Sequence, residues 1–167
     1  MDTNQEFKDL ILDKCLISEG GYLISDGSVV DTFVDFFQVL LHPQYSWEVI
    51  PTVTWQLKKR LWHTGSIAGR ETCGAILASR VSASLYIPTL VIRKDSDKIE
   101  GPGGPKSCVL VDDVTSAGVS MEDSVLKLRD SGYEVIGALS VVYRGRGADK
   151  VASRLGIPFE WLVYHPE

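Results

Sequence analysis

One stretch of the chain combines a buried-strand pattern with a polar loop, and it restricts the fold more than any other. The residues Ser107 to Ser120 read SCVLVDDVTSAGVS. The apolar run from Cys108 to Val111 is short, rich in valine and bounded by polar residues, which is typical of a central strand in a parallel sheet. Ligands of open α/β sheets bind at the carboxyl ends of such strands. The sequence therefore predicts a buried strand over 108–112 with a binding site at its end.

The residues that follow this strand suit a sugar phosphate. Asp112 and Asp113 are adjacent carboxylates, which accept hydrogen bonds from sugar hydroxyls. A loop of small and hydroxyl-bearing residues comes next, and then a helix is expected over 120–131 with Ser120 as its N-cap. Because a helix N-terminus presents free N–H groups and a positive dipole end, this loop favours a bound anion. The acid pair alone is also compatible with a simple turn.

From residue 61 onward, strand-like and helix-like segments alternate. Strands are expected over 61–66, 85–92, 135–142 and 159–163, and helices over 72–81 and 148–155, with loops at 67–71 and 93–107. Alternation of this kind implies right-handed crossovers and a mostly parallel sheet flanked by helices. The predicted fold class is therefore α/β.

The N-terminal part is less regular. An amphipathic helix is expected over 5–17, and a β-hairpin over 22–30 with a tight Asp26-Gly27 turn. The segment 31–41 fits either a strand or a helix. Residues 45–60 show no clear period, although the basic run 58–60 is typical of a solvated helix face.

Length and composition restrict the class of protein. The 167 residues suit one domain with an ample core. The net charge of -5 argues against a general nucleic-acid or membrane-surface role, and no apolar run is long enough for a membrane helix. The three cysteines are widely spaced within apolar segments, and the polar N-terminus lacks a signal-peptide core. We therefore expect a cytoplasmic protein with buried, reduced thiols.

The motif described first resembles that of a known family. The segment VLVDDVTSAGVS is similar to the PRPP-binding signature of the type I phosphoribosyltransferases. The resemblance implies that Asp112 and Asp113 contact the ribose hydroxyls of PRPP and that the following loop holds its 5′-phosphate. The loop residues are Val114, Thr115, Ser116, Ala117, Gly118, Val119 and Ser120. It also implies a single domain over 1–167, with a small hood (approximately 18–40 plus 157–167) on a core of approximately 61–156.

Two further segments are similar to the orotate enzymes of that family. The segment IAGRET, 67–72, stands where the family binds pyrophosphate, often through a strained peptide bond. The resemblance implies a pyrophosphate-binding role for Ala68, Gly69, Arg70 and Glu71. The pair Arg93-Lys94 resembles the start of the family's mobile catalytic loop, so the resemblance assigns pyrophosphate binding and catalysis to Arg93, Lys94 and Lys98.

The base site and the reaction follow from the same resemblance. Arg144 is expected to contact the orotate carboxylate with Thr115 beside the base, and Arg146 is the alternative. The implied reaction transfers the 5-phosphoribosyl group of PRPP to orotate and releases pyrophosphate. Mg²⁺ would be held mainly through PRPP, with Asp112 or Asp113 as an added ligand. A homodimer is implied, with small molecules as partners and neither nucleic acid nor membrane.

Two departures from the family pattern keep other functions open. Ile24 stands where the hood of the family usually has a lysine, and the loop after Arg93 lacks the usual histidine and is short. The alternatives are a phosphoribosyltransferase for a different base, a non-catalytic protein that binds PRPP or a nucleotide, and a nucleic-acid-binding regulator on the same fold.

Overall fold

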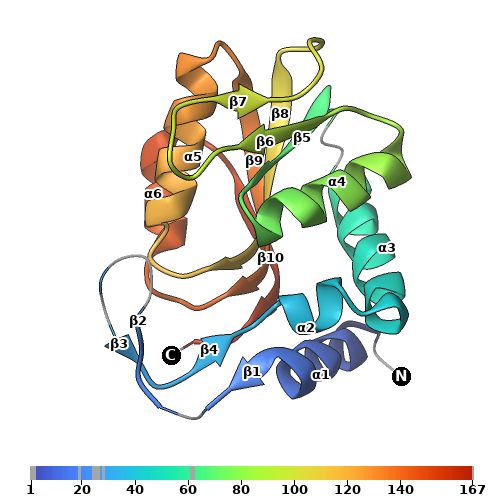
Figure 1. Cartoon of the computed structure of the whole chain (residues 1–167), viewed down its shortest axis with the longest axis vertical. Coiled ribbons are helices and arrows are strands. Elements are labelled where there is room, and N and C mark those ends of the chain that lie inside the picture. Colours follow the sequence, from blue (N-terminus) through green and yellow to red (C-terminus); the bar gives the residue numbers. More distant parts are fainter. Residues whose placement is uncertain (1–2, 19, 24–26, 28, 61–62, 167) are drawn as a thin grey trace.

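Figure 1 shows the computed structural model of the chain, which describes residues 3–18, 20–23, 27, 29–60 and 63–166. Within these residues, a central six-stranded sheet has the spatial order β10-β9-β8-β5-β6-β7. Its strands are β5 (Ser66–Arg70), β6 (Thr89–Ile92), β7 (Ile99–Glu100), β8 (Ser107–Thr115), β9 (Glu134–Tyr143) and β10 (Phe159–Tyr164). Only β7 runs antiparallel to its neighbour. The prediction of a mostly parallel sheet is confirmed.

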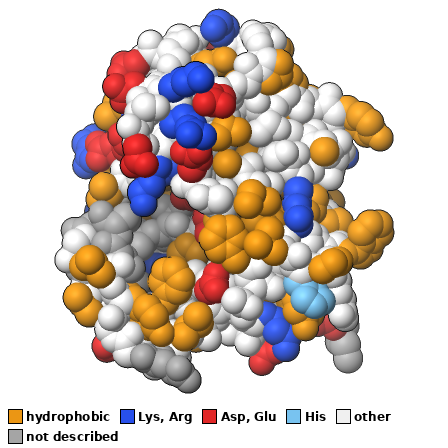
Figure 2. All heavy atoms as spheres, in the orientation of Figure 1, with side chains coloured by type: hydrophobic (Ala, Val, Ile, Leu, Met, Phe, Trp, Pro, Cys, Tyr) orange, Lys and Arg blue, Asp and Glu red, His pale blue; other side chains and the backbone are white. Residues whose placement is uncertain are grey.

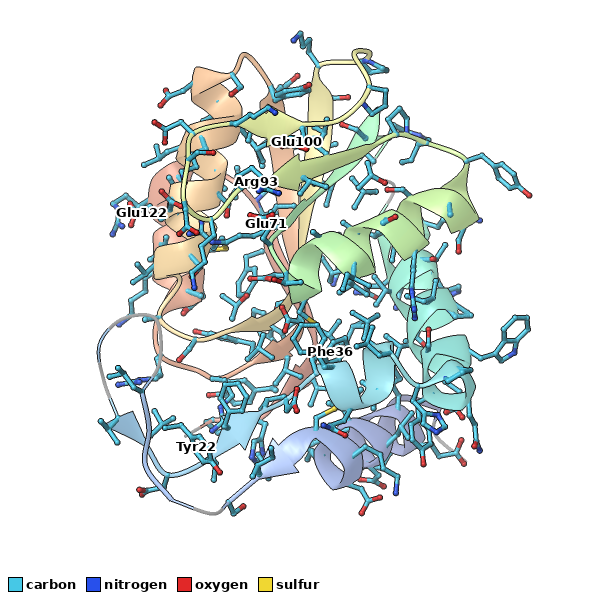
Figure 3. The ribbon with its side chains drawn as sticks, viewed as in Figure 1. Tyr22, Phe36, Glu71, Arg93, Glu100 and Glu122 are labelled. Carbon is cyan, nitrogen blue, oxygen red and sulfur yellow. The ribbon has the colours of Figure 1, made fainter. Side chains whose placement is uncertain are left out.

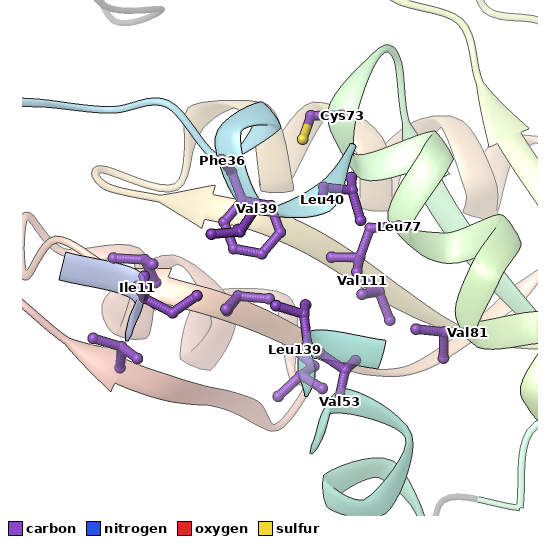
Figure 4. Close-up of a cluster of buried hydrophobic side chains, with 14 of the residues drawn as sticks. Ile11, Phe36, Val39, Leu40, Val53, Cys73, Leu77, Val81, Val111 and Leu139 are labelled. Atoms are coloured by element: carbon purple, nitrogen blue, oxygen red, sulfur yellow. The ribbon is translucent and has the colours of Figure 1, made fainter. Parts of the chain in front are cut away.

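Helices cover both faces of this sheet, so the strands are buried on both sides (Figure 1). One face carries α1 (Thr3–Cys15), α2 (Phe37–Leu40), α3 (Pro43–Lys59) and α4 (Cys73–Leu85). The other carries α5 (Val119–Asp130) and α6 (Ala148–Leu155). In β8, Val109 and Val111 pack in the core of the first face, while Cys108 and Leu110 pack in that of the second. Alternation along the strand thus fixes two cores, the first of which is drawn in Figure 4.

The structure corrects several predicted boundaries. The segment 67–71 is not a loop, because Ser66–Arg70 forms β5 between β6 and β8. No strand covers 63–65, and residues 61–62 lie outside the described part. The strand expected over 85–92 begins at Thr89, since the chain up to Leu85 is still in α4. The loop 93–107 contains β7, a short edge strand on β6.

The N-terminal region contributes helices to the core and a small hood. Segment 31–41, for which the sequence fits either a strand or a helix, contains one of each, since β4 (Phe33–Val34) is followed by α2. Residues 45–60, which show no clear period in the sequence, belong to α3 and its C-cap, and the buried Val49, Val53 and Leu57 of this helix recur every four residues. The basic run closes this helix, as Arg60 is its C-cap.

Two short antiparallel ladders form the hood. The strand β1 (Leu16–Ile17) pairs with β4, and β2 (Tyr22–Leu23) pairs with β3 (Val29–Val30), which confirms the predicted hairpin. Asp26 of its turn and Ile24 lie outside the described residues. The strand expected over 159–163 is β10, which pairs with β9 at one edge of the central sheet.

All three cysteines are free and buried, as predicted. A search of the described residues finds no helix long and apolar enough to cross a membrane.

Candidate active site

The strand order places the site between β5 and β8. From β5 the chain proceeds to β6 and β7 on one side, and from β8 to β9 and β10 on the other, so the order reverses between β5 and β8. Crevices at the carboxyl ends of strands beside such a reversal are the usual ligand sites of open α/β sheets. A cavity of about 890 Å³ lies there, lined by the ends of β5 and β8, the first turns of α4 and α5, and the hood.

The acid pair lies in the wall of this cavity. Asp112 and Asp113 belong to β8 itself, which extends to Thr115 because β9 continues its ladder that far. Burial and the adjacent negative charge of Asp113 hold the pKa of Asp112 well above its ordinary value. Burial also raises the pKa of Asp113, although a hydrogen bond from the Cys73 thiol opposes this rise. The pair therefore favours ligand groups that donate hydrogen bonds or carry positive charge.

Two close backbone approaches fix the position of Asp112. Gly74, in the first turn of α4, leaves no room for a side chain, because a Cβ there would lie 2.8 Å from Asp112 Oδ1. A Cβ on Gly69 would lie 2.1 Å from the Gly74 carbonyl oxygen. The two glycines thus let α4 pack directly on β5 and over the acid pair.

The loop of residues 115–120, after the acid pair, forms a corner of the cavity with groups that suit an anion, which we call the phosphate corner. The N-cap of α5 is Gly118, with a φ of 87°, rather than the predicted Ser120, which lies inside the first turn. Gly118 also packs closely on α6, since a Cβ there would lie 2.9 Å from Ala148 Cα. The Ser116 hydroxyl oxygen is one of the buried polar atoms without a hydrogen-bond partner in the described part of the chain. The free amides of the helix start and this hydroxyl suit a phosphate.

The predicted pyrophosphate segment is divided between strand and cavity. Ala68 and Gly69 are buried in β5 and are not among the cavity-lining residues, whereas Arg70 and Glu71 are. The Glu71 amide donates to the Ile92 carbonyl oxygen at 3.1 Å, so this N–H extends the sheet. The peptide bond between Glu71 and Thr72 is cis. The amides left for an anion are therefore those in the first turn of α4, beginning at Cys73.

Several cations in and near the cavity are paired with acidic residues. Arg70 pairs with Asp123, and Lys127 Nζ lies 3.3 Å from the same carboxylate. Arg93 pairs with Glu71 at 2.5 Å, and Lys98 with Glu100 at 3.2 Å. Figure 2 shows positive and negative side chains interspersed on the upper left of this face. Of the three predicted loop cations only Lys94 lines the cavity, while Arg93 and Lys98 lie outside its lining.

Arg144 connects β9 to the hood. Its side chain is 2% exposed, lines the cavity and donates from Nη2 to Thr32 Oγ1 at 2.5 Å. The Arg144 amide donates to the Thr115 carbonyl oxygen at 2.9 Å, which holds it beside the phosphate corner. Its rival, Arg146, is exposed and outside the cavity lining. Phe33 and Phe37 line the same cavity, so a guanidinium and two aromatic rings are available there for a planar ring with a negative group.

The sequence reasoning missed several cavity residues. Thr32 and Phe33 come from the hood, Phe37 from the start of α2, and Cys73 from the first turn of α4. Asp123 and Lys127 share a face of α5, at the four-residue spacing typical of a helical ion pair. That spacing was visible in the sequence, but nothing local shows that this face of α5 borders β5.

Curated proteins similar in sequence to this chain include several orotate phosphoribosyltransferases. A curated orotate phosphoribosyltransferase from Nostoc sp. is 30% identical over 155 residues, which are 85% of this chain and 74% of that protein. The chain belongs to the orotate phosphoribosyltransferase family. The crystal structure of orotate phosphoribosyltransferase from Aeropyrum pernix matches with a TM-score of 0.80 and 25% identity, covering 93% of this chain and 92% of that one. No family model matches the chain.

The family membership confirms the predicted type I phosphoribosyltransferase fold. A further member of the family, from Mycobacterium tuberculosis, was solved in complex with PRPP. Its structure matches this chain with a TM-score of 0.78 at 21% identity, and the match covers 97% of this chain and 96% of that one. At this identity the match shows that the two chains share a fold.

Proposed function

We propose that this chain transfers the 5-phosphoribosyl group of PRPP to orotate, forming orotidine 5′-phosphate and pyrophosphate in pyrimidine nucleotide biosynthesis. One observation carries the proposal. A single cavity joins the acid pair, the phosphate corner at the start of α5 and the buried Arg144. These are the three kinds of group needed for a ribose, its phosphate and a carboxylated base. The free, buried thiols suit the cytoplasmic location expected for such an enzyme.

The acid pair and the phosphate corner would hold the ribose 5-phosphate part of PRPP. Asp112 and Asp113 accept hydrogen bonds from the two ribose hydroxyls, and the loop of residues 115–120 surrounds the 5′-phosphate. When the base nitrogen bonds to C1 of the ribose and the bond from C1 to pyrophosphate breaks, positive charge develops on the sugar. The two carboxylates then stabilise a transition state of oxocarbenium character.

The pyrophosphate would occupy the part of the cavity between β5 and Lys94. Arg70, Lys94 and the amides in the first turn of α4 neutralise its charge as the bond to the ribose breaks. Arg93 and Lys98, on the same loop as Lys94, would join it when the loop closes over the ligand. In a homodimer this loop would reach the neighbouring site, as the family resemblance implies.

Orotate would bind between Arg144 and the hood. A bidentate pair between the guanidinium and the orotate carboxylate fixes the ring, with Phe33 and Phe37 as apolar walls and Thr115 beside the base. This arrangement positions the ring nitrogen over C1 of PRPP. Rate enhancement then comes from orientation and charge, without a covalent enzyme intermediate.

Mg²⁺ fits the acidic wall of the cavity. In the described residues no group of three or more His, Cys, Asp or Glu side chains could hold a metal ion alone. Mg²⁺ is commonly bound by one or two carboxylates together with substrate phosphates, which matches two adjacent carboxyl groups in the cavity wall. Asp112 or Asp113 would hold the ion with the diphosphate of PRPP, and the ion would offset charge on the leaving group.

A pyrophosphate-release assay with PRPP, Mg²⁺ and a panel of bases tests the reaction. We expect release with orotate only, and loss of PRPP binding by calorimetry in the double variant Asp112→Asn, Asp113→Asn. Asp130→Asn, an exposed position of α5 outside the cavity lining, is the control. Undiminished PRPP affinity in the double variant would contradict the proposal. PRPP binding without release for any base would identify the non-catalytic alternative.

A further inference from the structure

Glu71 makes two contacts that a phosphate oxygen would be expected to make. Its Oε1 lies 2.5 Å from Arg93 Nη1, and its Oε2 accepts a hydrogen bond from the Lys94 amide at 3.0 Å. Figure 3 shows Glu71 and Arg93 close together, with Glu100 beside them. Because a guanidinium and a backbone N–H are the usual donors to phosphate as well as to carboxylate, these two groups form an anion site that is already filled.

The filled site borders the place proposed for pyrophosphate. Glu71 and Lys94 both line the cavity, and the neighbouring Arg70 and Thr72 line it as well. We propose that the Glu71 carboxylate occupies the pyrophosphate site of the ligand-free protein and has to leave it when PRPP binds. This inference rests on the proposed function, since it assigns the anion that displaces Glu71.

The contacts of Glu71 are not needed to hold the fold. Its backbone is already fixed, because its N–H donates to Ile92 at the end of β6. The side chains of the ion pair are 26% exposed for Glu71 and 47% for Arg93, and pairs this accessible add little stability. Arg93 also has a second carboxylate, with Nε 3.9 Å from Glu100 Oε1, so release of Glu71 leaves it with an acidic neighbour.

Competition between Glu71 and PRPP predicts an affinity gain on neutralising Glu71. Breaking a half-exposed ion pair opposes ligand binding by roughly a two- to fivefold factor. In Glu71→Gln the amide oxygen still accepts from the Lys94 N–H, but the charge that holds Arg93 is gone. We therefore expect this variant to bind PRPP roughly two- to fivefold more tightly than the wild type.

Isothermal calorimetry of the full chain with Mg²⁺ tests this, with PRPP and, separately, inorganic pyrophosphate as probes. The control is Glu160→Gln, which removes the same charge from the ion pair of Glu160 and Arg60. In that pair the two side chains are 24% and 46% exposed, their charged atoms are 2.7 Å apart, and neither residue lines the cavity. We expect the gain for both probes in Glu71→Gln and an unchanged affinity in the control. Equal or weaker binding of pyrophosphate by Glu71→Gln would overturn the inference.

A double-mutant cycle separates displacement of the pair from a general effect of charge. In an Arg93→Met background Glu71 has no guanidinium to hold, so Glu71→Gln should then change the affinity by much less. A gain that persists undiminished there would refute the inference. If the wild type binds pyrophosphate but not PRPP, the proposed function fails while the pyrophosphate arm still decides the role of Glu71.

Discussion

Gly69→Ala should destabilise the protein far more than its position in a short strand suggests. The added Cβ would lie 2.1 Å from the Gly74 carbonyl oxygen and 2.6 Å from the Gly74 carbonyl carbon, and both atoms belong to the backbone of α4. A third contact, 2.6 Å from Ala78 Cβ, comes from the next turn of the same helix. Because no flexible side chain can give way, α4 as a whole must move by roughly 1 Å away from β5.

The magnitude follows from this overpacking. Extra atoms in a packed core cost about 1–3 kcal/mol, and contact with a rigid helix backbone puts this position at about 3 kcal/mol. For a chain of this size that lowers Tm by roughly 6–12 °C. The shift of α4 also moves Gly74 away from Asp112, so PRPP affinity should fall at temperatures where the variant is still folded.

Thermal melts followed by circular dichroism measure the loss of stability. The second readout is PRPP affinity by calorimetry, measured for each protein at a temperature 20 °C lower than its own Tm. Gly103→Ala is the control, because a Cβ at Gly103 has nothing within 4 Å. We expect Gly103→Ala to melt and bind PRPP like the wild type. A Gly69→Ala protein that melts within about 2 °C of the wild type would refute the packing argument.

Three further predictions concern the charged groups and thiols. Arg144→Met should lower kcat/KM for orotate roughly a hundredfold through loss of a charge-assisted pair, with the KM for PRPP little changed in steady-state assays; equal losses for both substrates would contradict its role. Burial holds the folded-state pKa of Asp112 above the ordinary aspartate value, so its contribution to stability is present at acidic pH and lost as pH rises through the folded pKa. Asp112→Asn should therefore raise Tm relative to the wild type at pH 8 but not at pH 4, and a gain of equal size at both pH values would contradict this. Burial raises the pKa of all three thiols, to about 12 for Cys15 and Cys108, and Cys73, although it lines the cavity, is buried as well. Ellman's reagent should therefore titrate no thiol in the native protein and all three after denaturation, and rapid labelling of the native chain would contradict this.

The local sequence was sufficient where one signal dominated. The strand β8, the helices α5 and α6 and the hood hairpin were predicted because apolar period, turn residues and length agreed. The segment Ser66–Arg70 was missed as a strand because it is short and contains glycine. It is a strand because β6 and β8 pair with it on both sides, and that pairing joins residues far apart in the chain.

The kinds of group in the candidate site can be read from a short stretch of the sequence. Adjacent acids after a buried strand, followed by a small-residue loop and a helix start, predict a site for a ribose phosphate, because donors and acceptors close in sequence are close in space. The tertiary structure decided which cations join them. In the folded chain Arg144 is buried and bonded to Thr32 of the hood, Lys94 lines the cavity, and Arg93 forms an ion pair with Glu71. Ion pairs of this kind depend on where the ends of separate strands lie relative to one another, and only the packing of the sheet sets those positions.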